Sequence, residues 1–389
     1  MKILTFIHFY LPGYKSGGPL KTIENMVEQL DMLDFLIVTS DRDLGDSVPY
    51  EGIRMNAWNK IGYSTVFYVS GANSKIGKFL KFIKLIKETE YDVVYFNSFF
   101  DAIFTFLPLL ALNFFVPNKK PIIIAPRGEF SAGAISLKRW KKVPYLYIIA
   151  KLGLLKNVTW HASTENEVRD IKHIYGKYDA AVRNGNNIRI AADVSPPPPA
   201  VVHQKPDNPV FKIIFLSRIS PKKNLAYLLS CLAKVATPIQ FNIYGPVEDR
   251  AYWSECQALM AALPAHIEAT YCGPRTPSEV PALMREHDLF FFPTLGENYG
   301  HVIIESLSAG TPVLISDQTP WTSDADGACI TLPLKNQQQF VTAIDEHAKK
   351  NYTTRRQISN AALKLAVTFT NNELTLQDNL NLFQHANAA

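Results

Sequence analysis

The 389-residue sequence has few cysteines and no cysteine cluster. Its four cysteines are scattered through the second half of the chain, and no two of them form a C-x-x-C pair. Disulfide frameworks and zinc ribbons need closely spaced cysteines. The pattern therefore argues against both and fits a reducing compartment.

The excess of positive over negative charge is small. There are 40 Lys and Arg residues and 35 Asp and Glu residues, which gives a formal net charge of +5. This excess gives no electrostatic sign of nucleic-acid binding, and we predict no nucleic-acid partner. No G-x-G-x-x-G segment is present, which disfavours a dinucleotide-dependent oxidoreductase. Two D-x-D segments, residues 41–43 and 324–326, lack a nucleotide-binding pattern around them, so we predict no metal site and no cofactor.

Uninterrupted apolar runs are short. Residues 99–116 hold one charge in 18 positions, but Asp101 and Pro108 interrupt the run, so we predict a buried or half-exposed helix rather than a membrane span. The apolar run at residues 3–7 is too short for a signal peptide and is followed at once by His8. We therefore predict that it is the first buried strand.

Elsewhere strands and helices alternate, which predicts an α/β protein with two open sheets. A proline-rich segment at residues 195–209 separates the halves, since consecutive prolines cannot join a sheet and form a stiff extended chain. We predict an N-terminal domain over residues 1–194, closed by a strand that ends at Asn184-Gly185. The C-terminal domain is predicted over residues 210–365.

Residues 288–316 are the most informative stretch. They predict a buried strand at 289–292, a loop at 293–300, a helix at 301–309 and a second buried strand at 313–315. The helix begins after a glycine loop, so its free N–H groups and positive dipole end suit a phosphate.

Two carboxylates lie in this stretch, Glu297 in the loop and Glu305 in the helix. Glu305 is about a turn and a half inside the helix, within reach of a sugar hydroxyl beside such a phosphate. A second polar group, Arg218 and Lys223, lies between a predicted strand and helix, where two cations can neutralise phosphate charge. By themselves these residues are more typical of solvated loops and turns than of a binding site.

The order P-x-x-x-E-x-x-G-x-x-x-x-E-x-x-x-x-G-x-P-V resembles the signature of glycosyltransferase family 4, whose members have the GT-B fold and retain the anomeric configuration. The matching positions are Pro293, Glu297, Gly300, Glu305, Gly310, Pro312 and Val313. Residues 217–224 are similar to the family's G-R-x-x-x-x-K-G element, with Ser217 and Asn224 in place of the glycines. The resemblance implies two Rossmann-like domains facing a central cleft, with residues 366–389 packing back on the N-terminal domain.

The resemblance also implies a role for each matched residue. Glu297, Arg218 and Lys223 are expected to be catalytic, with the two cations stabilising the leaving nucleoside diphosphate. Glu305 is expected to bind the ribose. The further donor-binding positions are Asn298, Tyr299, Gly300, Gly245 in a Gly-Pro turn, and the pair Gly17 and Gly18 after the first strand.

Arg127 and Asn97 depart from the family, because many members carry His at these two places. We place Arg127 on the acceptor side, as a ligand for a phosphate or an acidic sugar. A structural ion pair with Glu129 or Asp101 is the alternative.

The predicted protein is a nucleotide-sugar-dependent glycosyltransferase of the hexosyltransferase type, acting in surface polysaccharide or lipid-linked oligosaccharide assembly. A nucleotide-sugar 2-epimerase of the same fold and a non-catalytic sugar-nucleotide-binding protein are the alternatives. Its partners would be the nucleotide-sugar donor and a glycan or lipid-linked acceptor. Lysines and aromatic residues around positions 138–156 also suit an anionic membrane surface, with a solvated basic helix as the alternative. We predict a cytoplasmic location, at the inner face of the cytoplasmic membrane if this helix binds lipid.

Overall fold

The computed structural model describes residues 1–117, 119–136, 138–196, 206, 208–370 and 373–388. The chain forms two compact units. Unit 1 comprises residues 1–194 and 372–389, and unit 2 comprises residues 195–371. Most of the proline-rich linker predicted at 195–209 lies outside the described residues.

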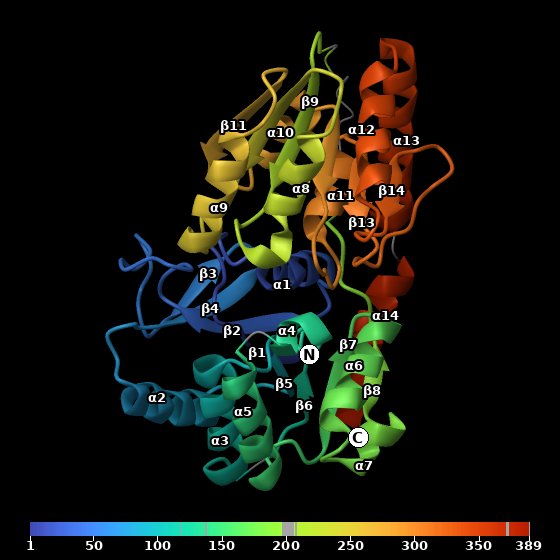
Figure 1. Ribbon diagram of the computed structural model, residues 1–389. Coiled ribbons are helices and arrows are strands. Elements are labelled where there is room, and N and C mark those ends of the chain that lie inside the picture. The colour runs from blue at the N-terminus through green and yellow to red at the C-terminus, as the bar shows by residue number, and fades with distance from the viewer. Residues whose placement is uncertain (118, 137, 197–205, 207, 371–372, 389) are drawn as a thin grey trace. The chain divides into compact units, whose positions relative to one another are not determined.

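Unit 1 is built on a sheet with the strand order β3-β4-β2-β1-β5-β6-β7-β8 (Figure 1). Its neighbouring strands are parallel except for the antiparallel edge pair β3 and β4. The strands are β1 (Lys2–Phe6), β2 (Asp34–Ser40), β3 (Trp58–Ile61), β4 (Ser64–Val69), β5 (Val93–Phe96), β6 (Ile122–Ile124), β7 (Val158–Ala162) and β8 (Ile188–Ile190).

Helices cover both faces of this sheet, with α1 on one side and α2, α3 and α5 on the other (Figure 1). Strand side chains alternate between the faces, so Tyr95 of β5 lies in the core beside α1 while Phe96 lies in the core beside α2. The helices are α1 (Gly18–Gln29), α2 (Lys75–Glu88), the π-helix η1 (Ala102–Phe106), α3 (Leu107–Phe114), α4 (Ala132–Ser136), α5 (Arg139–Lys151), α6 (Glu165–Tyr175), α7 (Ala180–Asn184) and α14 (Glu373–Ala388).

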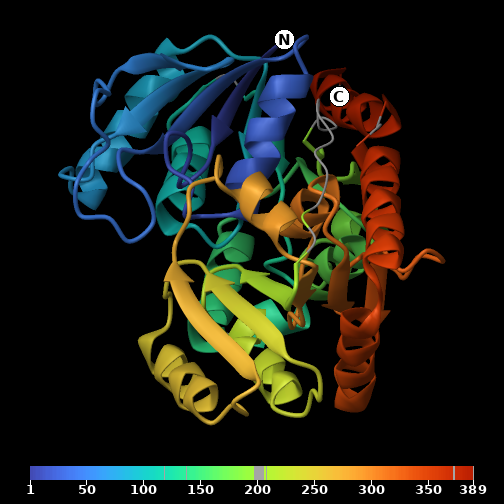
Figure 2. The same cartoon turned by 90° about the horizontal axis from the view of Figure 1, so that it is seen from above.

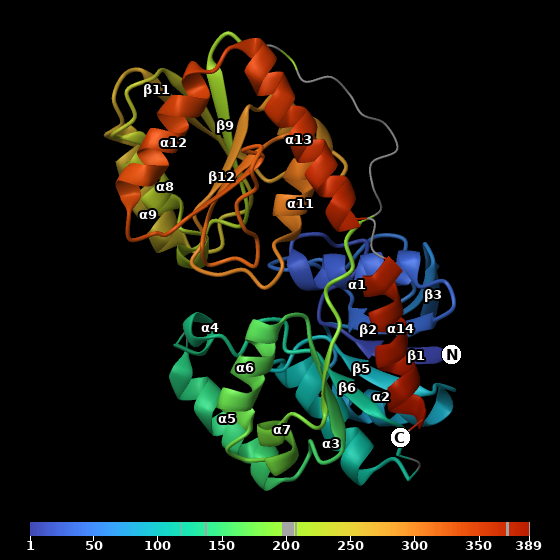
Figure 3. The same cartoon turned by 90° about the vertical axis from the view of Figure 1, so that its right-hand side faces the viewer.

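The C-terminal helix α14 packs on unit 1 although it follows unit 2 in the chain (Figure 3). The ring of Phe383 meets the edges of the Phe35 and Tyr95 rings, with centroids 5.9 and 5.3 Å apart. The Asn379 side-chain amide donates to the Ala192 carbonyl at 2.9 Å. The predicted return of the C-terminal helix to the N-terminal domain is confirmed.

Unit 2 has a parallel sheet with the strand order β11-β10-β9-β12-β13-β14, and β9 to β11 can be followed from yellow-green to gold in Figure 2. Buried apolar residues fill its central strands, because helices cover both faces. The strands are β9 (Phe211–Leu216), β10 (Ile239–Tyr244), β11 (Ile267–Gly273), β12 (Leu289–Phe292), β13 (Val313–Ser316) and β14 (Cys329–Leu332).

In Figure 3, α8, α9 and α12 lie on one side of β9 and β12, and α11 and α13 lie on the other. Phe291 of β12 stacks on Phe340 of α12, whereas its neighbours Phe290 and Phe292 stack on each other. The helices of unit 2 are the 3-10 turn η2 (Pro221–Lys223), α8 (Leu225–Leu232), α9 (Arg250–Ala261), α10 (Val280–Glu286), α11 (His301–Ser308), α12 (Gln337–Lys349) and α13 (Tyr352–Thr370).

The interpretation of Asn184-Gly185 as the end of a strand is wrong. Asn184 is the last residue of α7, and Gly185 closes that helix at φ 82° with its N–H directed to the carbonyls of Ala181 and Val182. Asn-Gly is typical of helix C-termini as well as of turns, because both need a left-handed backbone. Strand β8 follows this pair and is the last strand of unit 1.

Both sheets reverse their direction of growth once. In unit 1 the chain builds outward from β1 through β2 and then adds β5 on the other side of β1. In unit 2 it builds from β9 through β10 and then adds β12 on the other side of β9. Ligands of open α/β sheets bind outside the carboxyl ends of the strands at such a switch point. The expected ligand sites are therefore the carboxyl ends of β1 and β5 in unit 1 and those of β9 and β12 in unit 2.

Candidate active site

The loop after β12 is tied to the turn after β9. The Leu295 N–H and the Thr294 hydroxyl both donate to the Lys222 carbonyl, at 2.8 and 3.1 Å. The Glu297 N–H donates to the Gln318 carbonyl at 3.0 Å. The loop is thus held from two sides, and these hydrogen bonds fix the backbone position of Glu297.

Lys223 and Glu297, both predicted site residues, form an ion pair at this switch point. Lys223 Nζ lies 2.6 Å from Glu297 Oε1, and the Thr294 hydroxyl donates to the same oxygen at 3.1 Å. The two side chains are 12% and 14% exposed, so the pair is sheltered but still open to solvent. Lys223 also lies over the Phe292 ring, 5.4 Å from its centroid. A lysine ammonium has three N–H donors, so Lys223 can bind a second anion without releasing Glu297.

Electrostatics keep Glu297 ionised. Burial disfavours the carboxylate, but the charges of Lys223 and Lys222 outweigh burial and lower the pKa of Glu297 below its usual value. Burial also lowers the pKa of Lys222, and the neighbouring positive charges of Lys223 and Arg218 act in the same direction. Three cations, Lys222, Lys223 and Arg218, share this turn with two carboxylates, Glu297 and Glu248, which leaves a net positive charge for an anionic ligand.

Asn224 occupies the position of the second glycine in the family's G-R-x-x-x-x-K-G element. Its backbone is left-handed, with φ 61° and ψ 38°, and Asn tolerates this region better than most residues. Its side-chain amide donates to the Pro293 carbonyl at 2.9 Å, which adds another tie between the two loops.

Arg218 lies in the same turn but points to a different partner. Its Nη1 is 3.1 Å from Glu248 Oε2, and both side chains are partly exposed, at 32% and 44%. Gly245 supports the backbone beside it: with φ 135°, a Cβ there would lie 1.9 Å from the Ser217 carbonyl oxygen. Only glycine fits this contact.

Helix α11 begins at the end of the same loop. Gly300 is its N-cap residue, left-handed at φ 85°, and no side chain caps the first N–H groups. The Tyr299 hydroxyl bonds to the Ser195 hydroxyl, and the Tyr299 carbonyl accepts from Trp321 Nε1 at 2.6 Å. Glu305 lies on α11 and is half-buried, and Asn298 is half-buried in the loop. Unit 2 thus assembles Lys223, Glu297 and the α11 N-terminus, with Arg218, Gly245 and Glu305 on the adjoining elements.

The remaining predicted residues belong to unit 1. Gly17 is the N-cap of α1, left-handed at φ 76°, and Gly18 is the first residue of that helix. No side chain caps this end of α1. The Asn97 amide donates to the Pro19 carbonyl at 3.1 Å and so fixes the start of α1 to the end of β5.

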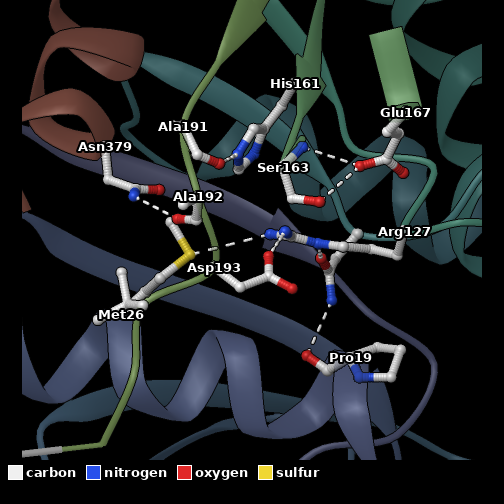
Figure 4. Close-up of polar contacts among 12 residues, drawn as sticks. Pro19, Met26, Arg127, His161, Ser163, Glu167, Ala191, Ala192, Asp193 and Asn379 are labelled. Carbon is white, nitrogen blue, oxygen red and sulfur yellow. Dashed lines mark hydrogen bonds and ion pairs between the residues drawn. The ribbon is translucent and has the colours of Figure 1, made fainter. Parts of the chain in front are cut away.

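Arg127 is buried and fully engaged within unit 1 (Figure 4). Its Nη1 pairs with the carboxylate of Asp193, and both side chains are 4% exposed. Its Nε donates to Asn97 Oδ1 at 2.7 Å, and its Nη2 donates to the Tyr95 hydroxyl at 2.5 Å. Tyr95 in turn bonds to His161 Nδ1 at 2.9 Å. These contacts end in a fixed residue at every nitrogen of the guanidinium.

This network holds the chain where it leaves unit 1. His161 Nε2 bonds to the Ala191 carbonyl at 2.8 Å, Asn379 holds the Ala192 carbonyl, and Arg127 holds Asp193 (Figure 4). The Asn25 amide donates to the Val194 carbonyl at 2.8 Å. Burial, together with the positive charge of Arg127, lowers the pKa of His161 to about 3, so this ring stays neutral.

The alternative ion pair of Arg127 with Glu129 or Asp101 is wrong in its partners, since Asp193 takes that place. Glu129 instead accepts from the N–H groups of Phe99 and Phe100 at 2.6 and 3.0 Å. Asp193 lies 66 positions from Arg127, beyond any local pattern. The acceptor-side role of Arg127 stays a prediction, and its burial favours an indirect role through Asn97.

Comparison with known proteins identifies the fold of this site. Residues 202–365 match the family Glycosyl transferases group 1. This domain belongs to the group 1 glycosyl transferases. The resemblance to glycosyltransferase family 4 is thereby confirmed, and so is the coarse prediction of a glycosyltransferase.

Solved structures similar to the whole chain share the GT-B fold. Alr3699/HepE of Anabaena, in complex with UDP and glucose, matches with a TM-score of 0.70 at 15% identity, over 100% of both chains. Sucrose-phosphate synthase of Thermosynechococcus elongatus matches with a TM-score of 0.69 at 13% identity, over 100% of this chain and 99% of that one. An uncharacterized 41.2 kDa protein in the cps region of Klebsiella pneumoniae is 28% identical over 65% of this chain and 68% of its own length.

Two residues of the site in unit 2 were not predicted from the sequence. Lys222 carries the loop contacts and a lowered pKa, and Thr294 bonds to both Glu297 and the Lys222 carbonyl. Their position beside Lys223 and within the 293–300 loop was the available signal. Over the described ranges no group of three or more His, Cys, Asp or Glu side chains is placed to hold a metal ion. No helix in the same ranges is long and apolar enough to cross a membrane.

Proposed function

We propose that the protein is a retaining glycosyltransferase that moves a sugar from a nucleotide-sugar donor to an acceptor hydroxyl, with the donor bound by unit 2. The observation that carries this proposal is the 2.6 Å Lys223–Glu297 pair at the switch point of the unit 2 sheet, beside the uncapped N-terminus of α11. A sheltered carboxylate beside several cations and a helix N-terminus suits a sugar attached to a diphosphate.

The chemistry follows from where charge develops. As the bond between the sugar and the diphosphate breaks, negative charge grows on the leaving oxygen. Fixed cations there lower the barrier. Lys223 is held in place by Glu297 and Phe292, so little reorganisation is needed at the moment of reaction. We assign Arg218 to the same diphosphate, with release from Glu248 on binding. Glu305 is assigned to the ribose, and the backbone of Asn298, Tyr299 and Gly300 to the phosphates and sugar.

A UDP-hexose is the donor to test first, and a surface glycan the first acceptor. The structural similarity to a protein in complex with UDP and glucose supports the donor. The relative in a cps region supports an acceptor in surface polysaccharide assembly.

Helix α5 supports an acceptor at a membrane surface. It exposes Trp140 at 74% and Tyr147 at 56% beside Lys141 and Lys151. Aromatic rings with flanking lysines suit the headgroup region of an anionic bilayer. Co-sedimentation with vesicles of phosphatidylglycerol tests this contact. Binding that survives Trp140→Ala together with Lys141→Ala would argue against α5 as the contact.

The deciding experiment is a thermal-shift screen with UDP, GDP and ADP, followed by an assay of nucleoside diphosphate release from the matching nucleotide sugars. A ligand that binds the native state raises the unfolding midpoint, and a hundredfold excess over Kd contributes about 2.7 kcal/mol. Release of the nucleoside diphosphate, with retained anomeric configuration in the sugar product, supports the proposal. An epimerised donor with no release would favour a 2-epimerase, and no shift with any of the three nucleotides would refute donor binding.

A further inference from the structure

Helices α2 and α3 of unit 1 expose a cluster of apolar side chains. Ile76 and Leu80 of α2 are 73% and 60% exposed. Phe114 and Phe115, at the C-terminal end of α3, are 58% and 49% exposed. The rings of Phe79 and Phe115 pack edge to face with centroids 5.4 Å apart, which joins the two helices. These five residues form what we call the α2–α3 patch. Single exposed apolar residues are ordinary on a protein surface, but a cluster of them marks an interaction site.

The sequence of α2 explains why part of its apolar surface faces outward. Phe82, Leu85 and Ile86 are buried in the core of unit 1. Ile76 and Leu80 are four positions apart, so they lie on one side of the helix, and this side is next to the buried one. The apolar stripe of α2 is therefore wider than the core of unit 1 can cover.

The patch continues toward α5. The side-chain amide of Asn113, the residue before Phe114, donates to the Leu154 carbonyl at 3.1 Å, so the end of α3 lies beside the end of α5. Leu152, the residue that caps α5, is 45% exposed. All three helices lie on the same side of the unit 1 sheet (Figure 1). The patch is thus an extension of the surface on which α5 exposes its aromatic rings.

Lysines accompany the apolar side chains of the patch. The 14 residues of α2 include five lysines and a single carboxylate, that of Glu88. Lys84 is 73% exposed, and its ion pair with Glu88 is long, at 3.9 Å. Lys119 and Lys120, which follow α3 in the chain, are also exposed. This surface therefore combines apolar groups with an excess of positive charge.

The positive charge favours one kind of partner. A second copy of the chain, placed across a two-fold axis, would bring the lysines of α2 against the same lysines, and like charges repel. An anionic bilayer offers negative headgroups to the ammonium groups and an apolar layer below them to the apolar side chains. The long lysine stems can lie along that layer while their charges stay among the headgroups.

We propose that the α2–α3 patch is a docking surface for a bilayer of anionic phospholipids. The apolar side chains of the patch enter the boundary between headgroups and acyl chains, and the lysines of α2 lie at the lipid phosphates. The bilayer contact of unit 1 is therefore not confined to α5 but extends across α3 to α2. This assignment does not depend on the donor chemistry of unit 2.

The charged part of the surface is tested with Lys84→Gln together with Lys87→Gln in the full chain. Co-sedimentation with vesicles of phosphatidylglycerol and phosphatidylcholine measures the partition coefficient. Each lysine near an anionic surface contributes about fivefold, so this double variant should bind about 25-fold more weakly at about 0.1 M NaCl. Salt at about 1 M shortens the Debye length to about 3 Å and should remove most of the difference between variant and wild type.

The apolar part is tested with Ile76→Ser together with Leu80→Ser. Both side chains are exposed, so the fold does not depend on them. The partition coefficient should fall about tenfold or more, because two apolar side chains no longer leave water on binding. The binding that remains should still weaken with salt, since the lysines are kept.

A matched control is Lys60→Gln together with Tyr63→Ser. It removes an exposed lysine and an aromatic ring that is 74% exposed, both at the β3–β4 turn of unit 1 and outside the patch. This variant should bind vesicles as the wild type does. An unchanged thermal midpoint and an unchanged thermal shift with nucleotide show that each variant is folded and that donor binding is untouched.

Wild-type partition in both α2 double variants, with loss only in Trp140→Ala together with Lys141→Ala, would confine the contact to α5 and overturn the assignment. Equal binding of the wild type to vesicles of phosphatidylcholine alone would overturn the role of the lysines. Self-association of the wild type that the α2 variants abolish would assign the patch to a second copy instead. Each of these results leaves the proposed glycosyltransferase function intact, because that function is judged by nucleotide binding and nucleoside diphosphate release.

Discussion

The two units share one architecture and place different chemistry at the same point of it. Each sheet reverses its growth between two central strands, and each has a carboxylate with a basic partner there: Lys223 with Glu297 in unit 2, His8 with Asp101 in unit 1. Lysine supplies a permanent charge, whereas histidine exchanges a proton near neutral pH. The same position in the two sheets therefore holds a permanent cation in unit 2 and an imidazole ring in unit 1.

A second contrast concerns burial. Lys223 and Glu297 are 12% and 14% exposed, whereas Arg127 and Asp193 of unit 1 are both 4% exposed and bonded on every side. An ion pair that solvent can reach can also bind a ligand. One that is sealed off can only hold the fold.

The largest effect is expected at the charge-stabilising pair of unit 2. Lys223→Ala removes the cation that we propose lies beside the leaving diphosphate, and we expect nucleoside diphosphate release to fall by about 10³-fold or more. Glu305→Ala is expected to abolish measurable transfer through loss of the ribose contact. The free energy of unfolding of both variants in urea should stay within about 1 kcal/mol of the wild-type value, because neither side chain lies in the apolar core.

Wild-type activity in either variant would refute the assigned roles. A matched control is Lys234→Ala, which removes another lysine of unit 2, one that is exposed and bonds to Gln337 away from the switch point. Its release rate should equal that of the wild type.

The sealed pair of unit 1 should behave in the opposite way. Arg127→Met leaves Asp193 buried without its cation, and loss of one partner of a buried pair costs about 3–5 kcal/mol. The double variant Arg127→Met with Asp193→Leu should recover much of that loss, because no buried charge remains. Urea unfolding of the three proteins measures this, and exposed Lys84→Ala, which breaks the surface pair with Glu88, should change stability by less than about 0.5 kcal/mol.

If Arg127→Met keeps full stability but loses acceptor use, Arg127 contacts the acceptor directly. That result would support the acceptor-side role predicted from the sequence. It would also show that a buried ion pair can contribute to ligand binding.

The site of unit 2 could be predicted from the sequence more fully than the contacts of unit 1. The residues of its site lie in two short segments, 217–224 and 293–305, so their spacing is visible in one dimension. The alternation of strands and helices predicted the sheet and the return of the C-terminal helix followed from the family resemblance. What could not be predicted there is how Lys222 and Thr294 tie the two segments together, since that needs the distance between β9 and β12.

The important side-chain contacts of unit 1 join residues that are far apart in the sequence. His8 and Asp101 are 93 positions apart, and Arg127 and Asp193 are 66 apart. No periodicity links such pairs, and only the strand order brings them together. The prediction that a strand ends at Asn184-Gly185 was wrong for another reason. The same two residues are typical both of helix C-termini and of turns. Strand β3 is short and partly exposed, which leaves a weak alternation to detect.

A glycine pair in unit 2 sharpens the argument about backbone fit. Gly245 and Gly273 both have positive φ, at 135° and 75°, but a Cβ at Gly245 would strike the Ser217 carbonyl at 1.9 Å while a Cβ at Gly273 meets nothing within 4 Å. Gly273→Ala should cost about 1–2 kcal/mol from backbone strain alone. Gly245→Ala should cost about 3 kcal/mol and displace Arg218, since strain and overpacking add. Equal urea midpoints for the two variants would contradict the close approach.

The smallest effect compares a buried histidine in each unit. Burial lowers the pKa of His161 in unit 1 to about 3 and that of His347 in unit 2 to about 4, against an ordinary value near 6.5. The unfolded chain binds a proton at each as the pH falls below 6.5 and the folded chain does not, so stability decreases from pH 6.5 toward the folded pKa. Between pH 7 and pH 5 each histidine should cost about 2 kcal/mol.

His347 offers the cleaner test, because its Nε2 is buried without a hydrogen-bond partner, whereas both nitrogens of His161 are bonded. His347→Leu removes a titrating group and exposes no new polar atom. Hydrogen exchange of the α12 segment should therefore depend less on pH than in the wild type, by about 2 kcal/mol over this interval, while the strands of unit 1 keep their acid sensitivity. The exposed His173→Gln should change neither unit. If His347→Leu also relieved the acid sensitivity of unit 1, the two units would unfold as one cooperative body, and free energies measured in either unit would describe the whole chain.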